Sequence, residues 1–213
     1  MNSVQPSASL AEQAYQLLEQ KLVTLALAPG EQISEGRLIE MTGFGRTPVR
    51  EAIQRLAQQE FFLVMPRKGV VVTPVNRAGM VHILEARKPL EQVIVYRAAL
   101  NAVDTQRSEI SAIARQLSIS HESFEEFLQL DTGLDKLLDR CAGNPYASAA
   151  LAPLRSHCRR FWYYHRHQMK LSDAISAHSN MARLVARRDY NGARKASDAV
   201  IAVMERLVAG IER

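Results

Sequence analysis

Apolar side chains recur at helical spacing in three segments near the N-terminus of this 213-residue chain. The first segment starts at Ser9, which with Glu12 has capping-box spacing, and it stops at the helix-breaking pair Pro29-Gly30. The second starts at Ser34, a favourable N-cap, and stops at Gly43. Their apolar stripes are Leu18, Leu22 and Leu25, then Leu38, Ile39 and Met41. Because the third segment follows Gly43 almost at once, we predict a helix-turn-helix.

The third segment, residues 47–58, separates apolar from cationic positions. Apolar residues at i, i+3, i+4 and i+7 predict a buried stripe of Val49, Ala52, Ile53 and Leu56. Pro48 suits the first turn of a helix, and Thr47 before it is positioned to cap that turn. The outer face keeps Arg46, Arg50 and Gln54. A helix that points arginines outward from its N-terminal turn is typical of recognition in the DNA major groove.

Two strand-like runs follow the third helix. They are Phe62–Met65 and Val70–Thr73, with the basic segment Pro66–Gly69 between them. β-Branched and aromatic residues favour strands, and two such runs around a turn are typical of a hairpin. We therefore predict a hairpin with a basic tip, a wing, over residues 62–74. Helical periodicity takes over near residues 74–77, so we expect a first domain at residues 1–75.

The remaining residues, 78–213, have helical periodicity. The predicted helices cover residues 80–100, 108–117, 122–141, 145–168, 172–188 and 189–211. Their connecting loops are short and polar. The expected fold class is mainly α, with an N-terminal winged helix-turn-helix followed by an all-α helical bundle.

Five short strings in the first third of the chain carry a family resemblance. They are Pro29-Gly30, Ile33-Ser34-Glu35, Gly45-Arg46-Thr47-Pro48-Val49-Arg50-Glu51-Ala52, Arg55-Leu56 and Arg67-Lys68-Gly69. Together they resemble the winged helix-turn-helix of GntR-type bacterial transcription regulators. The resemblance implies operator contacts by Arg46, Thr47, Arg50, Arg67, Lys68 and Gly69. Many members have an arginine where this chain has Gly36, so Arg37 is the candidate for that further contact.

Charge is unevenly distributed along the chain, whose formal net charge is +5. Residues 46–77 hold six basic and two acidic side chains, a concentration that suits contact with phosphates. Residues 78–152 are acidic, with seven basic and ten acidic side chains. Residues 153–213 hold twelve basic and five acidic side chains, and this excess is typical of a solvated helix surface.

Several compositional features indicate a cytoplasmic protein. The two cysteines, Cys141 and Cys158, lack metal-type spacing and fit a reducing compartment. No apolar run approaches the ~18 residues of a membrane span. Residues 1–9 have neither the positive charge nor the apolar core of a signal peptide. We therefore expect no membrane partner.

Three polar residues fall on apolar helix faces of the bundle. Asp131 and Asp135 lie one turn apart on the apolar side of the helix at 122–141, and His178 lies on the apolar stripe of the helix at 172–188. Carboxylates turned toward a core require a metal, a cationic partner or a proton. A pairing of Asp131 with a nearby arginine, beside an ordinary core histidine, is the alternative to a ligand site. Taken together, the three residues suggest a polar cavity.

A second resemblance covers the bundle. It rests on Arg87–Glu91, Asp131-Thr132-Gly133-Leu134-Asp135, Gly143-Asn144-Pro145, and His178 followed by Asp189 and Ala193. These elements resemble the FCD effector-binding domain, which also supplies dimer contacts. Many FCD domains bind a divalent metal through one aspartate and three histidines. The implied positions here are Asp131, Asp135 and His178, while the fourth falls near Val200, which cannot be a ligand. The resemblance thus implies at most an oxygen-rich divalent-metal site completed by water.

Arginines and aromatic residues are concentrated in Arg159–His167. Such a segment offers a carboxylate clamp and flat pocket walls, although an amphipathic helix with solvated arginines has the same pattern. Arg87 is a further candidate from the resemblance. We therefore predict that a small carboxylate effector binds at Arg87, Arg159 and Arg160.

These features predict a homodimeric transcriptional repressor whose affinity for double-stranded operator DNA is modulated by that effector. One alternative is a DNA-binding protein that needs no effector. A hydrolase using Asp131-Thr132-Gly133 is a more remote alternative, because aspartic-protease chemistry needs two such aspartates beside β-structure. We expect the chain not to be an enzyme.

Overall fold

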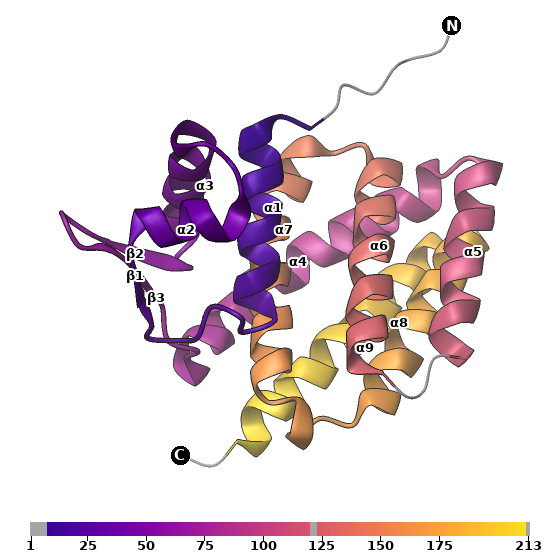
Figure 1. The fold of residues 1–213 in the computed structure, drawn as a ribbon. Coiled ribbons are helices and arrows are strands. Elements are labelled where there is room, and N and C mark those ends of the chain that lie inside the picture. The colour runs from indigo at the N-terminus through magenta and orange to yellow at the C-terminus, as the bar shows by residue number, and fades with distance from the viewer. Residues whose placement is uncertain (1–7, 120–122, 212–213) are drawn as a thin grey trace, which may run out of the picture. The chain divides into compact units, whose positions relative to one another are not determined.

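The computed structural model describes residues 8–119 and 123–211 (Figure 1). The chain divides into two compact units, Met1–Val75 and Asn76–Arg213. The described residues form nine α-helices and one three-stranded sheet, which confirms the mainly α fold class. The leader segment considered above falls largely on residues 1–7, outside the described residues.

The first unit combines three helices with a small antiparallel sheet. Its elements are α1 (Leu10–Val23), β1 (Gln32–Ile33), α2 (Glu35–Thr42), α3 (Arg46–Gln58), β2 (Phe62–Met65) and β3 (Gly69–Val72). Strand β3 is central: Ile33 of β1 lies opposite Val70, and Phe62 of β2 lies opposite Val72. The β2–β3 hairpin was expected from the sequence, whereas β1 was not, because two residues are too few to show a strand pattern.

The helix ends follow the capping residues. The Oγ atom of Ser9 accepts a hydrogen bond from the backbone N–H of Glu12 at 3.1 Å, and that of Ser34 accepts one from Arg37 at 3.2 Å. Gly43 ends α2 in the left-handed conformation, with φ at 71°. These three local predictions are confirmed.

Two expectations at the helix ends are wrong. Gly45, not Thr47, is the N-cap of α3, and it provides no side-chain cap. Since the first turn needs no hydrogen bond from the nitrogen of Pro48, the helix can begin before the proline, at Arg46. Leu25 lies beyond the end of α1, with φ at 58°, and it is Leu27 that is fully buried.

Gly69 allows the sheet to close. Its φ is 96°, and a Cβ atom at this position would collide with the carbonyl oxygen of Ile33. Only glycine combines this backbone conformation with such a close approach. Gly69 is thus required for the pairing of β1 with β3.

The second unit is an all-helical bundle. Its elements are α4 (Arg77–Asn101), α5 (Asp104–Ile119), α6 (Phe124–Ala142), α7 (Pro145–Tyr164), the 3-10 turn η1 (Arg166–Gln168), α8 (Leu171–Ala186) and α9 (Tyr190–Gly210). Helix α4 packs against α6, α7, α8 and α9 and so lies at the centre of the unit. Helix α5 starts four residues earlier than expected, and α7 ends four residues earlier. None of the helices that the structure describes is long and apolar enough to cross a bilayer.

Candidate nucleic-acid interface and buried charge cluster

Helix α3 exposes the side chains assigned to DNA contact. The predicted stripe of Val49, Ala52, Ile53 and Leu56 is buried, at 5% exposure or less. Arg46, Thr47, Arg50 and Gln54 are exposed. The apolar stripe fixes the rotation of α3 on the core of the first unit, and that rotation leaves the cationic face in solvent.

Glu35 brings the two leading arginines of α3 together. Both of its carboxylate oxygens lie 2.8 Å from Nε of Arg50, and Oε1 lies 3.7 Å from Nε of Arg46. Glu35 is the first residue of α2, so its negative charge also lies at the favourable end of the helix dipole. This role of Glu35 was not predicted, since no local sequence pattern indicates that it lies next to Arg50.

A surface groove of about 660 Å³ adjoins this ion pair. It is lined by Glu35, Arg50, Glu51, Gln54, Arg55 and Gln58. Arg55 is held on the protein side of the groove: it donates to Glu12 at 2.5 Å, and its guanidinium lies 3.7 Å from the centre of the Tyr15 ring. Arg50, whose side chain is 61% exposed, is thus more available than Arg55, whose side chain is 45% exposed.

The remaining DNA candidates lie in α2 and at the hairpin tip. Arg67 and Lys68 are exposed, and Gly69 is half-buried against β1. Arg37 is also exposed and pairs with Glu40 at 3.4 Å. Such an exposed pair contributes about 0–1 kcal/mol, so it offers little resistance to a competing phosphate.

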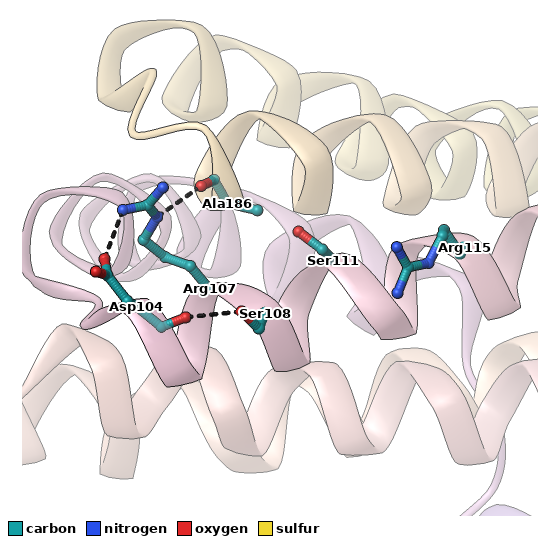
Figure 2. A pocket seen from close by; sticks show the side chains of 6 residues that line it. All are labelled: Asp104, Arg107, Ser108, Ser111, Arg115 and Ala186. Atoms are coloured by element: carbon teal, nitrogen blue, oxygen red, sulfur yellow. Dashed lines mark hydrogen bonds and ion pairs between the residues drawn. The ribbon is translucent and has the colours of Figure 1, made fainter.

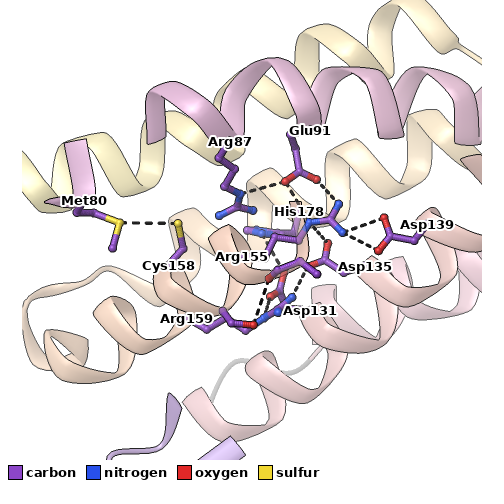
Figure 3. Close-up of polar contacts among 12 residues, drawn as sticks. Met80, Arg87, Glu91, Asp131, Asp135, Asp139, Arg155, Cys158, Arg159 and His178 are labelled. Carbon is purple, nitrogen blue, oxygen red and sulfur yellow. Dashed lines mark hydrogen bonds and ion pairs between the residues drawn. The ribbon is translucent and has the colours of Figure 1, made fainter. Parts of the chain in front are cut away.

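A buried charge cluster occupies the middle of the helical bundle (Figure 3). Its members are Arg87 and Glu91 from α4, Asp131, Asp135 and Asp139 from α6, Arg155 and Arg159 from α7, and His178 from α8. All except Asp139 are at most 8% exposed. Polar groups removed from water to this extent must find partners inside the protein.

Arginines satisfy the carboxylates of the cluster. Arg155 donates to Glu91 at 2.5 and 3.2 Å and to Asp139 at 3.1 and 3.2 Å. Its Nε also lies 3.3 Å from Asp135. Arg159 bridges the two candidate metal ligands, donating to Asp131 at 2.7 Å and to Asp135.

His178 completes the contacts of Asp131. Its Nδ1 lies 2.7 Å from the carbonyl oxygen of Ala174, and because a carbonyl can only accept, Nδ1 carries a proton. Its Nε2 lies 3.2 Å from Oδ1 of Asp131. The rings of Phe127 and Trp162 lie edge-on to the imidazole at centroid distances of 5.3 and 5.6 Å.

The cluster shifts the pKa values of its acids in opposite directions. Burial raises the pKa of Glu91, but Arg155 and Arg87 more than offset that effect and hold it at about 2. Burial likewise acts upward on the pKa of Asp131, and Arg159 and His178 overcome it, so the pKa falls below its usual range. For Asp135, burial together with repulsion from Asp131 outweighs the arginines, and the pKa rises to about 6.

The residues expected to bind metal do come together, but as arranged they do not fit a divalent ion. The guanidinium of Arg159 already bridges Asp131 and Asp135, and the position expected for a ligand in the last helix is the buried Val200. Across residues 8–119 and 123–211, no group of three His, Cys, Asp or Glu side chains is placed to hold a metal. A cationic partner, one of the alternatives left open by the sequence, compensates the two carboxylates.

The candidate effector arginines are also buried. Arg87 donates to Glu91 at 3.0 Å and Arg159 to Asp131, so neither carries uncompensated charge. Arg160 is 2% exposed, and burial lowers its pKa to about 10. Two of the three predicted clamp residues, Arg87 and Arg159, are therefore engaged in internal ion pairs.

Sequence reasoning missed Arg155 and Asp139, although a signal was present. Asp131, Asp135 and Asp139 repeat every four residues on α6, and Arg155 and Arg159 repeat every four residues on α7. Residues four apart share a helix face. The observed pairs, Asp139 with Arg155 and Asp131 with Arg159, run in opposite directions along the chain, as expected for antiparallel helices.

A second pocket, of about 380 Å³, lies between α5 and α8 (Figure 2). It is lined by Asp104, Arg107, Ser108, Ser111, Arg115 and Ala186. Arg107 donates to the carbonyl oxygen of Ala186 at 2.9 Å and to Asp104 at 2.8 Å. This arginine thus ties the end of α8 to α5, a structural role that the sequence did not indicate.

Comparisons with known proteins agree with both units. The profile of the bacterial regulatory proteins of the gntR family matches residues 10–72, and the FCD domain profile matches residues 82–203. The HTH-type transcriptional repressor RspR of Escherichia coli (strain K12) is 25% identical over 160 residues, which cover 74% of this chain and 70% of that protein. The HTH-type transcriptional regulator McbR of the same strain is 30% identical over 114 residues, covering 54% and 52%.

The structural comparison shows the same fold. The solved structure of E. coli McbR/YncC superposes with a TM-score of 0.80 at 21% identity, over 95% of this chain and 96% of that one. A putative GntR regulator from Rhodococcus sp. RHA1 has a TM-score of 0.70 at 14% identity, over 97% and 100%. With its gntR-family segment and its FCD domain, the chain belongs to the GntR family of bacterial transcription regulators.

Proposed function

We propose that this regulator reads operator DNA with helix α3 and the β2–β3 wing. The observation that carries the proposal is the pair of arginines one turn apart on α3: Arg46 and Arg50 keep 74% and 61% of their side-chain surface exposed. The arginine fork suits guanine in the major groove. The proposed contacts are Arg37, Arg46, Thr47, Arg50, Arg67, Lys68 and Gly69.

One winged helix reads only a few base pairs, so useful specificity requires two copies. We propose a cytoplasmic homodimer on a palindromic operator whose half-sites lie about one helical turn, roughly 10 base pairs, apart. The test is selection of duplexes from a randomised library by the full-length protein. Enrichment of such a palindrome is expected, and a pool that remains random after several rounds would overturn the proposal.

We further propose that the FCD domain binds a small carboxylate metabolite and that this binding releases the DNA. Arg87 and Arg159 already hold internal carboxylates, so their guanidinium groups are placed to bind a carboxylate, and an incoming one would displace Glu91 or Asp131. Arg160, in the same helix as Arg159, is a further candidate. Such a ligand can change the affinity of the protein for DNA only if it binds the DNA-competent and DNA-incompetent states of the protein with different affinities.

Effector binding is tested through the fluorescence anisotropy of a labelled duplex that the protein has selected, because the anisotropy falls when the protein releases the DNA. A panel of small mono- and dicarboxylates is titrated into the protein–DNA complex, and at least one is expected to release the duplex. If none releases it, the effector-independent alternative is favoured. A hydrolase gains no support, because Asp131 lies within the continuous helix α6 and is separated from Asp135 by a guanidinium, rather than sharing a proton with a second aspartate.

A further inference from the structure

We infer that Glu35 sets the DNA specificity of α3 by holding the guanidinium of Arg50 and by partly cancelling the charge of its arginine pair. The inference rests on the proposed function, in which α3 reads DNA. Glu35 itself belongs to α2 and would touch no base. Its role is to position Arg50 and to weaken binding to DNA of the wrong sequence.

The position of Glu35 is fixed by its own helix. The preceding Ser34 caps α2 through its side chain, and Leu38, one turn after Glu35, is fully buried in the core of the unit. The carboxylate is only 31% exposed, whereas the arginines that it contacts are more than half exposed. A partly buried acid thus contacts two more exposed cations.

The contact leaves the reading end of Arg50 available. Both hydrogen bonds to Glu35 come from Nε, and the terminal nitrogens Nη1 and Nη2 make none with the described residues. A guanine edge presents two acceptors, O6 and N7, that pair with such a two-nitrogen fork. Because Nε is anchored, the fork loses less freedom on binding than a solvated arginine would. Glu35 therefore favours a base contact by Arg50.

The same contact disfavours phosphate binding. Arg46 and Arg50 carry two positive charges, and Glu35 reduces the sum to one. Sequence-independent binding depends on the number of phosphates that cations neutralise, with a salt slope of about −0.9 per phosphate on duplex DNA. A phosphate at the fork of Arg50 carries a full negative charge and is repelled by the nearby carboxylate of Glu35, whereas a neutral guanine edge is repelled much less. Glu35 therefore lowers the affinity of the protein for random DNA more than its affinity for operator DNA.

Three variants separate positioning from charge. Glu35→Gln removes the charge but keeps the length of the side chain. Glu35→Asp keeps the charge but shortens the reach to Arg50 by one methylene group. Glu51→Gln is the matched control, because Glu51 is an exposed acid in the same groove and makes no ion pair with the described residues.

The probes are a duplex selected by the wild-type protein and a scrambled duplex of equal length and composition. The measurements are anisotropy titrations at several salt concentrations, and circular dichroism checks that each variant is folded. For Glu35→Gln we expect about threefold tighter binding to the scrambled duplex, with a salt slope steeper by about 0.9. The selected-to-scrambled affinity ratio should fall by about fivefold or more, the lower end of what one bidentate contact supplies.

For Glu35→Asp we expect scrambled-duplex affinity within about twofold of wild type and weaker binding to the selected duplex. Glu51→Gln should leave the ratio within about twofold. The inference is overturned if Glu35→Gln keeps the wild-type ratio and salt slope, or if Glu51→Gln reproduces its effect. If Arg50→Ala lowers the selected-to-scrambled affinity ratio while both Glu35 variants keep the wild-type ratio, the inference about Glu35 fails and the proposed function of α3 stands. Failure of the wild type to select any sequence would instead overturn the proposed function.

Discussion

Replacing Arg155 by Met is predicted to lower the free energy of unfolding of the FCD domain by about 3–5 kcal/mol at pH 7, the usual cost of leaving buried charges without their partner. Arg155 is 2% exposed and contacts three carboxylates, those of Glu91, Asp135 and Asp139. Methionine fills much of the same volume, so a cavity contributes little to the loss. The loss arises because the charge cluster, which has three arginines and four carboxylates, keeps only two of its arginines.

The expected loss depends on pH. Without Arg155, Glu91 retains Arg87 alone, so its pKa rises from about 2 and the buried carboxyl binds a proton more readily. Protonation removes the uncompensated charge. The difference in unfolding free energy between wild type and variant should therefore shrink as the pH falls below about 5.

The assay is urea unfolding followed by the fluorescence of Trp162. This residue is the single tryptophan of the chain, is 1% exposed and lies in α7, so its signal reports the FCD domain. Arg140→Met is the control: Arg140 pairs with Glu109 at 3.8 Å, both more than half exposed, and its loss should cost about 0–1 kcal/mol. An Arg155 variant whose unfolding free energy stays within about 1 kcal/mol of wild type, roughly the cost of losing a surface pair, would contradict this prediction.

Three further predictions concern single residues. Because the folded-state pKa of Glu91 is held at about 2, below its ordinary 4.5, its stabilisation is complete above pH 4.5 and is lost as the pH falls toward 2; urea midpoints from Trp162 fluorescence should drop across that window, and a flat profile would count against it. Gly69→Ala should cost at least about 1–3 kcal/mol in the winged-helix unit, measured by thermal unfolding, and an unchanged melting temperature would contradict the clash with Ile33. Gly45→Ser should stabilise α3 by a few tenths of a kcal/mol, since Gly45 is an N-cap without a side-chain hydrogen bond; destabilisation would argue against that N-cap.

Local patterns predicted much of the first unit. The stripe of α3 and the caps at Ser9 and Ser34 depend on residues three or four apart, so the sequence displays them directly. Strand β1 depends instead on pairing with β3, whose residues lie almost forty positions away. No local pattern marks such a pairing, and the ion pair between Glu35 and Arg50 was missed for the same reason.

In the helical bundle, the local sequence pattern did not determine which group compensates the buried carboxylates. The sequence placed Asp131 and His178 on buried faces correctly, but it left a metal, a cation and a proton open as ways to compensate the acid. The packing of α7 beside α6 decides between them, because it brings Arg159 to Asp131 at 2.7 Å. A tertiary contact, rather than residue type or spacing, makes the site an ion-pair cluster.

One affinity ratio shows whether α3 reads bases through Arg50. Wild type and Arg50→Ala are titrated by anisotropy against the wild-type-selected duplex and its scrambled counterpart at one salt concentration. We predict a loss of about 1–3 kcal/mol on the selected duplex and a much smaller loss on the scrambled one, so that the ratio collapses. An equal loss on both duplexes would make Arg50 a phosphate contact and would contradict the claim, as would no loss on either.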